Sequence, residues 1–335
     1  MSYVIGPEDC GQRLDMFLAR RLPDMTRSQL QGLNRRGGIR VNGSFEKAGY
    51  RLRIRDSVEV DAARATPAGI RAEAIPLDVR YEDVHLAVIE KPAGMVVHPG
   101  AGHTGNTLAH ALMARFPGVA DVGDAGRPGV VHRLDKWTSG LIVIARTPET
   151  HHRLTAAFRL RQVRKEYVAL VHGCVRQDSG VIELGIRRHP SVRTRMSAHT
   201  GGGRTAHTEY RVLERSPQFT LLAVRIRTGR THQIRVHLRA IGHPVVGDAT
   251  YGGKLHGAFV RKHGDPGRYF LHAAKLGFPH PHTGEPMSFE SPLPADLDAL
   301  WAQLKRGSAA LQARATGPDR PEARGIPDPR GPNPL

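Results

Sequence analysis

The sequence predicts an α+β protein: a mixed, largely antiparallel sheet with flanking helices, preceded by a small helix-plus-hairpin domain. Two observations support this fold class. Strand patterns outnumber helix patterns in the longer, later part of the chain and are not interleaved regularly with them. An earlier compact basic segment ends in a stretch rich in small residues. We therefore divide the chain into a first domain at 1–62, a linker at 63–75, a second domain at 76–305 and a disordered tail at 306–335.

The charge of the chain is strongly positive. There are 49 Lys and Arg residues against 31 Asp and Glu residues, which gives a formal net charge of +18 over 335 residues. An excess of this size indicates a polyanionic partner, most often nucleic acid. The alternative is a solvated basic surface with no such partner.

Cysteine usage and the N-terminal sequence bear on the location of the protein. Cys10 and Cys174 are the only cysteines, too few for a disulfide framework or a cysteine-built zinc site. The N-terminus carries acidic residues where a signal peptide has a basic region and an apolar core, and no apolar run reaches membrane-spanning length. We expect a soluble cytoplasmic protein with no membrane partner.

The first domain combines two helix patterns with a hairpin signal. Thr26 is the expected N-cap of the second helix, and the first helix stops near Pro23. The pair Asn42-Gly43 favours a tight turn between strands. The elements expected here are helices at 14–22 and 26–36 and strands at 39–41 and 57–60.

The stretch Gly129 to Thr147, GVVHRLDKWTSGLIVIART, is the most informative part of the chain. Its β-branched run at 141–145 predicts a buried strand, so Asp135 lies in a turn beside the core. A carboxylate there is poorly solvated unless it is paired, so it is either a structural ion-pair member or a reactive group. A second basic cluster, TGRTHQIRVH at 228–237, follows about a hundred residues later.

The remaining elements of the second domain follow from local patterns. Thr147 caps a helix whose first residue is Pro148. The segment from Gly307 onward has six prolines, four glycines and no aromatic residue, so it cannot offset its ordering entropy by burial. The other expected elements are strands at 84–89, 167–171, 208–213 and 219–226 and helices at 108–116 and 232–241.

Three other functions were tested against the sequence. Gly100, Gly102 and Gly105 have the spacing of a dinucleotide-binding loop, with 95–97 as the preceding strand. The fit is imperfect, because Pro99 stands just before the loop and the rest of a doubly wound sheet is not evident downstream. The HRLD order and the absence of an Asp-Phe-Gly triplet argue against a kinase. The 19 histidines have no metal-site spacing.

The first domain resembles a known RNA-binding module. Residues 13–60 are similar in pattern to the domain named after the fourth small-subunit ribosomal protein, and the interval from Arg20 to Arg55 holds ten basic and two acidic residues. The resemblance implies structured RNA as a partner. The basic residues that we expect to contact this RNA are Arg27, Arg35, Arg36 and Arg40.

The second domain resembles the RluA family of RNA pseudouridine synthases. The blocks that carry the resemblance, in order, are GVVHRLDKWTSGLIVIA, KEYVALVHG, TGRTHQIRVHL and GHPVVGDATYG. With EKPAGMVVHPGAG and the late LHAAKLGFPHPHTGEPM, the layout is most similar to the RluD branch, which modifies large-subunit ribosomal RNA. Trp137 departs from the family's pattern, which usually has a small or polar residue there.

The chemistry of such an enzyme explains these residue types. Uracil must be detached from the ribose, turned, and rejoined through its fifth carbon, and an ionised carboxylate can attack the sugar or stabilise its cationic character. The resemblance assigns that carboxylate to Asp135, its pairing guanidinium to Arg235 and the aromatic side chain that meets the flipped base to Tyr167. Arg133 resembles the residue that fills the gap left by the flipped nucleotide. The residues expected to bind substrate are His132, Arg133, Thr138, Arg230, His232 and Gln233.

We therefore expect an RNA pseudouridine synthase, a cytoplasmic monomer that acts on large-subunit ribosomal RNA or a ribosomal particle without cofactor or metal. Two alternatives stay open at this point. One is an RNA-binding protein whose second domain has no catalytic activity, and the other is a dinucleotide-dependent enzyme built on Gly100 to Gly105.

Overall fold

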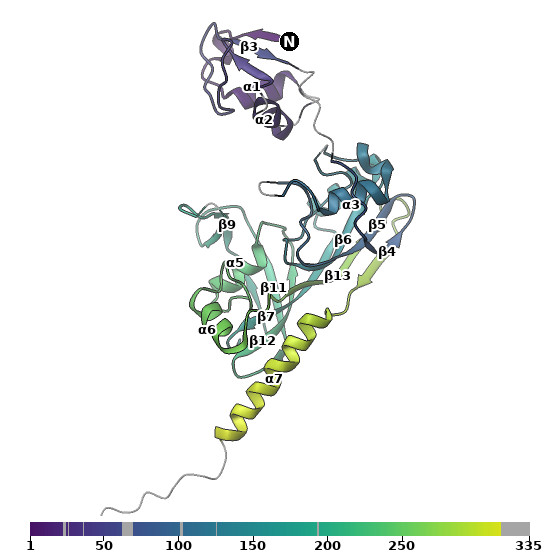
Figure 1. Cartoon of the computed structure of the whole chain (residues 1–335), viewed down its shortest axis with the longest axis vertical. Coiled ribbons are helices and arrows are strands. Elements are labelled where there is room, and N and C mark those ends of the chain that lie inside the picture. The colour runs from purple at the N-terminus through teal and green to yellow at the C-terminus, as the bar shows by residue number, and fades with distance from the viewer. Residues whose placement is uncertain are drawn as a thin grey trace, which may run out of the picture.

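The computed structural model contains two separate hydrophobic cores, one in each expected domain (Figure 1). It describes residues 1–22, 25, 27–35, 37–61, 70–100, 103–124, 126–192 and 194–315. The side chains of 27–29 and 308–315 are not among the described ones. Four residues with roles predicted above also lie outside the described residues: Pro23, Thr26, Arg36 and Gly102.

The N-terminal domain is a three-stranded antiparallel sheet with two helices. The sheet has the order β1-β3-β2, and buried side chains from both helices and the sheet form its core, including Phe17, Leu33 and Val58. Its elements are β1 (Ser2–Val4), η1 (Pro7–Asp9), α1 (Leu14–Arg21), α2 (Arg27–Arg35), β2 (Ile39–Val41) and β3 (Ser57–Val60).

The expected hairpin differs from the prediction. Asn42 and Gly43 do form a turn with positive φ angles of 51° and 76°, closed by hydrogen bonds between Val41 and Ser44. The strand that pairs with β2, however, is β3, which begins only at Ser57. Strand β1 was not expected, because three residues at the N-terminus are too few to show an alternating pattern.

A nine-stranded mixed sheet organises the second domain. The strand order is β4-β5-β6-β13-β7-β12-β11-β8, with β14 paired to β13, and the pairing of β6 with β13 is the one parallel pairing in it. This confirms the predicted fold class. The strands are β4 (Asp78–Glu82), β5 (Leu86–Lys91), β6 (Ser139–Ala145), β7 (Arg164–His172), β8 (Ser179–Ile182), β11 (Thr208–Arg215), β12 (Phe219–Ile226), β13 (Leu271–Pro279) and β14 (Pro286–Glu290).

Burial explains why the strand patterns could be read from the sequence. All seven residues of β6 are buried, as its uninterrupted β-branched run predicts.

A separate hairpin, β9 (Gly185–Arg188) and β10 (Met196–His199), lies apart from the main sheet and packs near α5. The helices of this domain are α3 (Leu108–Arg115), η3 (Pro117–Asp121), α4 (Pro148–Arg159), α5 (Gln233–Ala240), α6 (Gly253–His263) and α7 (Ala295–Ala315).

Helix ends follow local sequence signals. The Thr147 hydroxyl accepts the Thr150 backbone N–H at 3.2 Å, and Pro148 is the first residue of α4, as expected. In Figure 1, α5 and α6 lie together at one flank of the sheet, while α3 lies beside β5 and β6. Among the described residues, no helix combines the length and apolar character needed to cross a bilayer.

Two other expectations need correction. Helix α7 continues to Ala315, so residues 306–315 are helical and the tail assigned to them begins too early; residues 316–335 lie outside the description. The segment 95–97, proposed as the strand before a dinucleotide loop, forms only an isolated bridge between Val96 and Thr107. The sheet is not doubly wound, so the basis for that loop is missing.

We expect Gly140→Ala to lower the free energy of unfolding by about 2–4 kcal/mol. Gly140 has a φ of 112°, and a Cβ built there would lie 2.3 Å from the carbonyl oxygen of Ala273 across the parallel pair. Urea unfolding measures the change. Gly118→Ala is the control, because that glycine faces open space with no positive φ. Equal stability of the two variants would contradict this account.

Candidate active site

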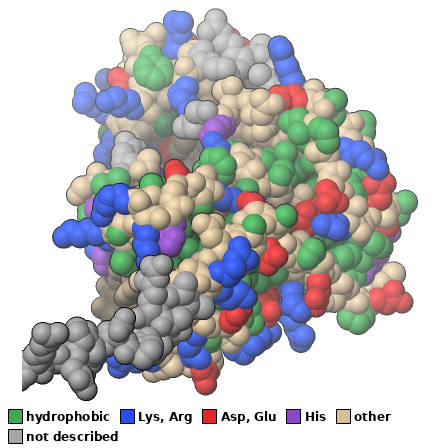
Figure 2. All heavy atoms as spheres, turned by 60° about the horizontal axis from the view of Figure 1, so that its bottom comes forward, with side chains coloured by type: hydrophobic (Ala, Val, Ile, Leu, Met, Phe, Trp, Pro, Cys, Tyr) green, Lys and Arg blue, Asp and Glu red, His purple; other side chains and the backbone are tan. Residues whose placement is uncertain are grey.

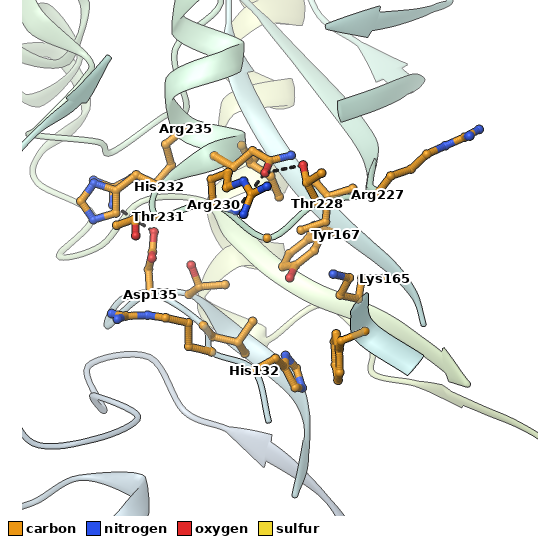
Figure 3. Close-up of a pocket in the computed structure, with 18 of the residues that line it drawn as sticks. His132, Asp135, Lys165, Tyr167, Arg227, Thr228, Arg230, Thr231, His232 and Arg235 are labelled. Carbon is orange, nitrogen blue, oxygen red and sulfur yellow. Dashed lines mark hydrogen bonds and ion pairs between the residues drawn. The ribbon is translucent and has the colours of Figure 1, made fainter. Parts of the chain in front are cut away.

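A cavity of about 460 Å³ opens where three segments of the second domain converge (Figure 3). The segments are the loop before β6, the start of β7, and the chain that connects β12 to α5. Asp135, Tyr167 and Arg235, which lie far apart in the sequence, all line it. The structure therefore brings together the three residues expected to be catalytic.

Asp135 occupies a turn between buried anchors. The preceding Leu134 is buried, and the Asp135 carbonyl accepts the Thr138 backbone N–H at 3.1 Å, just before β6 begins. Its side chain keeps 17% of its accessible surface. The carboxylate is therefore held by the core on one side and reachable from the cavity on the other.

Arg235 is the ion-pair partner of Asp135, at 3.2 Å between Nη1 and Oδ2. It also donates to both carboxylate oxygens of Asp248, at 2.7 and 3.0 Å. The guanidinium lies 4.2 Å from the ring centroid of Tyr269 and 5.0 Å from that of Tyr251. The two hydrogen bonds to Asp248 and the two aromatic rings hold the Arg235 guanidinium in one orientation. In this orientation its Nη1 is directed at Asp135.

Asp248 was quoted in the sequence blocks but given no role. It is fully buried, and its Oδ1 also accepts the backbone N–H groups of Thr250 and Tyr251, at 3.0 Å each. A buried carboxylate needs such partners, because desolvation otherwise disfavours its charge. The sequence shows that Asp248 belongs to the block GHPVVGDATYG. Its contact with Arg235 of α5 depends on the tertiary fold, so the sequence alone does not show it.

Lys91 is a second residue that sequence reasoning missed. Its ammonium is buried and donates to the carbonyl groups of Pro92, Met95 and Lys136, at 2.7, 3.0 and 3.3 Å. Burial lowers the pKa of Lys91 to about 7, although the Asp135 charge acts in the opposite direction. These hydrogen bonds connect the turn after β5 with the loop that carries Asp135.

Tyr167 lies on β7 and is buried at the floor of the cavity. Burial, and then the negative charge of Asp135, raise the pKa of its phenol. The side chain is therefore a neutral phenol at physiological pH, and it presents an apolar ring face beside the carboxylate.

His132 lines the cavity but has a structural contact. Its Nε2 accepts the backbone N–H of Val143 in β6 at 3.0 Å, and its ring lies 4.7 Å from that of Phe158. Burial, with a smaller effect of Lys165, lowers the pKa of His132 to about 3. A neutral imidazole that accepts a backbone hydrogen bond stabilises the loop, and the expected contact of His132 with substrate stays a prediction.

Three more expected substrate residues also have internal partners. Gln233 uses its amide fully: its Oε1 accepts from Thr228 and its Nε2 donates to the carbonyl of His207. The Thr138 hydroxyl is 3.2 Å from that of Tyr269. His232, in the left-handed region with φ of 56°, has its Nδ1 2.8 Å from the Tyr251 hydroxyl.

Arginine side chains surround the cavity and outnumber its acids. Asp135 is the one carboxylate among the lining residues. The arginines of the lining, besides Arg235, are Arg133, Arg159, Arg161, Arg227 and Arg230. Arg133 is exposed, and Arg230 donates its Nε to the Thr205 carbonyl. On the face shown in Figure 2, Lys and Arg are widespread, whereas Asp and Glu gather on one side.

The N-terminal arginines expected to bind RNA are only partly described. Arg35 and Arg40 are exposed, and they donate hydrogen bonds to the backbone carbonyls of Gln31 and Gly43. The Arg27 side chain and all of Arg36 lie outside the described residues.

Within the described part of the chain, no group of three or more His, Cys, Asp or Glu is arranged to hold a metal ion.

Trp137, two residues beyond Asp135, is 41% exposed and lies next to Gly94. The Lys136 ammonium is 5.2 Å from its ring centroid. The unusual residue therefore covers the turn after β5 without entering the cavity.

Comparison with known proteins gives the same assignment for both domains. The family model described as RNA pseudouridylate synthase matches residues 85–240, and the S4 domain model matches residues 12–58. Human RNA Pseudouridylate Synthase Domain Containing 1 aligns with a TM-score of 0.54 and 28% identity, over 75% of this chain and 99% of that one.

Bacterial relatives extend the match over most of the chain. An uncharacterized RNA pseudouridine synthase of Bacillus subtilis is 41% identical over 89% of this chain and 96% of its own length. Ribosomal large subunit pseudouridine synthase D of Nitrosomonas europaea is 43% identical over 88% of this chain and 85% of its own length. The protein of the same name in Pseudomonas aeruginosa is 42% identical over 90% of this chain and 94% of its own length. Similarity along nearly the full length of these relatives means that this chain belongs to the RluA-type family of RNA pseudouridine synthases, with an S4 domain at its N-terminus.

Proposed function

We propose that this enzyme converts uridines of large-subunit ribosomal RNA to pseudouridine in the cytoplasm, with the Asp135 carboxylate as its reactive group. The names of the relatives from Nitrosomonas and Pseudomonas support the choice of RNA. The observation that carries the mechanism is the Asp135–Arg235 pair at the edge of a cavity that holds no other carboxylate.

The reaction needs a carboxylate that stays charged in a poorly solvated pocket. Arg235 supplies the compensating charge, and Asp248 keeps that guanidinium oriented, so Asp135 is paired without being enclosed. From this position Asp135 attacks the ribose C1′ or stabilises its cationic character while the bond to uracil breaks. Arg235 is thus a positioning and charge-stabilising residue for Asp135.

Tyr167 provides the surface for a base that has left its stack. Leaving the stack costs a few kcal/mol, and a buried aromatic face offsets part of it. Because the pKa of the phenol is raised, Tyr167 is a poor base in the resting enzyme. Its ring contact with uracil is therefore its main role, and removal of the C5 proton falls to another acceptor.

The exposed guanidinium groups fit an RNA backbone. Arg133 and Arg230 lie at the cavity, where phosphates next to the flipped nucleotide pass, and Arg35 and Arg40 belong to the S4 domain. Phosphate contacts fix the position of the RNA but carry no sequence information. The site thus divides into contacts that position the RNA and a pocket that selects the base.

We expect Asp135→Asn to reduce isomerisation about a thousandfold or more, because Asn keeps the shape but lacks the charge that the reaction needs. The assay is tritium release from ribosomal RNA labelled at C5 of uracil, with RNA affinity measured in parallel by filter retention. Affinity should persist, since phosphate contacts dominate it. Asp178→Asn, at an exposed carboxylate, is the control. Full tritium release by a folded Asp135→Asn protein would falsify the assignment.

Asp248→Asn tests how Arg235 is positioned. The variant leaves the buried Arg235 with a neutral partner, so we expect turnover to fall about a hundredfold while RNA affinity stays near normal. We also expect a loss of about 3 kcal/mol in the free energy of unfolding. Turnover is measured below the melting temperature. A variant that loses stability but keeps its turnover number would limit Asp248 to a structural role.

The joint change Arg35→Gln and Arg40→Gln tests the role of the S4 domain. If both guanidiniums contact phosphate, RNA affinity falls and the slope of log K against log salt becomes shallower by roughly 1.5. The matched control is Arg115→Gln with Arg153→Gln, because these exposed arginines are already paired with Glu82 and Glu149. An unchanged slope in the Arg35 and Arg40 variant would contradict this role.

A further inference from the structure

Lys165 is a cation in the cavity for which the structure provides no acceptor. It lies on β7 among the lining residues, and the described residues offer its Nζ no hydrogen bond or ion pair. Its Nζ lies 5.3 Å from the ring centroid of Phe158. An ammonium that is partly buried in a cavity is stabilised by an anionic or carbonyl acceptor, so we look for that acceptor in the substrate.

The neighbouring strands offer Lys165 no free carboxylate. Across the sheet, its register partner on β13 is the buried Leu276, and Ile226 of β12 lines the cavity close to it. The adjacent Glu166 is already paired with Arg225. The strands on both sides of Lys165 therefore bring it no carboxylate.

Lys165 lies on the side of Tyr167 that is away from Asp135. The two residues are two positions apart on one strand, so their side chains leave the same face. Burial, and then the Asp135 charge, raise the pKa of Tyr167, whereas burial alone lowers the pKa of Lys165, to about 8. Figure 3 shows the same order, with Tyr167 drawn between the carboxylate and the ammonium.

This order matches the long axis of uracil. When the ribose C1′ is at Asp135 and the ring lies against Tyr167, N1 faces the carboxylate and the opposite carbonyl, O4, is at the far end. On the basis of the proposed function, we propose that the Lys165 ammonium donates a hydrogen bond to O4 of the flipped uracil. Lys165 is thereby a base-contacting residue of the reaction.

The contact has a consequence for the chemistry. When the C1′–N1 bond breaks, its electron pair leaves with the base, and the resulting negative charge spreads over the ring nitrogen and both carbonyl oxygens. An ammonium at O4 stabilises that charge without giving up its proton, as preorganised donors do at developing anions. C5 then bonds to C1′, its proton is lost, N1 gains a proton, and the product is an isomer of the substrate.

The same contact discriminates between pyrimidines. Uracil presents a carbonyl acceptor at C4, whereas cytosine presents an amino group that donates. A lysine, which only donates, is left unpaired by cytosine in a poorly solvated pocket, and such mismatches reduce kcat/KM strongly. Lys165 is therefore also a specificity determinant.

Lys165→Met tests the proposal, because Met fills similar space without a donor. We expect kcat for tritium release from C5-labelled ribosomal RNA to fall about a hundredfold or more, with RNA affinity and its salt slope unchanged. Lys275→Met is the matched control, since that lysine lies on the neighbouring strand, is exposed and pairs with Glu290. Thermal melting establishes that both variants are folded.

Lys165→Arg adds a readout that a structural role would not change. Wild-type turnover should decline above about pH 8 as Lys165 loses its proton, and this decline should be absent with arginine, which stays charged. The groups around Lys165 do not account for it: His132 is neutral throughout, the pKa of Tyr167 is raised, and Arg159, Arg161 and Arg227 stay charged. Any effect of Lys91 is common to both proteins.

The outcomes separate this proposal from the proposed function. A wild-type protein that releases no tritium overturns the proposed function. If the wild type is active, unchanged kcat in Lys165→Met overturns the contact with O4. A loss of affinity with a shallower salt slope and normal kcat also overturns it and assigns Lys165 to a phosphate oxygen instead. A decline above pH 8 that is the same in Lys165→Arg overturns the role of its charge.

Discussion

The catalytic domain depends on keeping a charged guanidinium inside its core. Arg235 is stable there only because Asp248 binds it at two points and Tyr251 and Tyr269 cover its faces. Asp248 in turn is stabilised by the backbone of its own turn. Asp135 is added to an ion pair that is already complete, so in the proposed mechanism it can separate from Arg235 without leaving an isolated charge in the interior.

The charges of the cavity act on different parts of the substrate. In the function proposed above, Asp135 acts on the sugar and Lys165 on the far end of the base, while the exposed arginines of the lining, Arg133, Arg159, Arg161 and Arg227, contact the RNA backbone. A site with one carboxylate among many cations attracts the RNA backbone over a long range. Local pairing of Asp135 with Arg235 prevents that carboxylate from opposing the attraction.

Local signals made much of this structure predictable, and long-range contacts limited the rest. Strand β12 and the Thr147 cap matched their predicted positions because periodicity and capping are properties of a few consecutive residues. Family blocks indicated Asp135, Tyr167 and Arg235. Asp248 and Lys91 received no role, since their functions arise from partners on other elements. The sequence also does not show that Val143 and Thr228 make hydrogen bonds with His132 and Gln233, two residues whose predicted contact with substrate stays a prediction.

The position of β13 at the centre of the sheet has a consequence for synthesis on the ribosome. This strand joins β6 to β7, yet it is made about a hundred residues or more after them, so the two halves of the sheet cannot be joined while the chain is still short. Arg235 and Asp248 also come late. The S4 domain, with its own core, can fold first. A nascent chain can therefore hold RNA well before it has a site able to modify it.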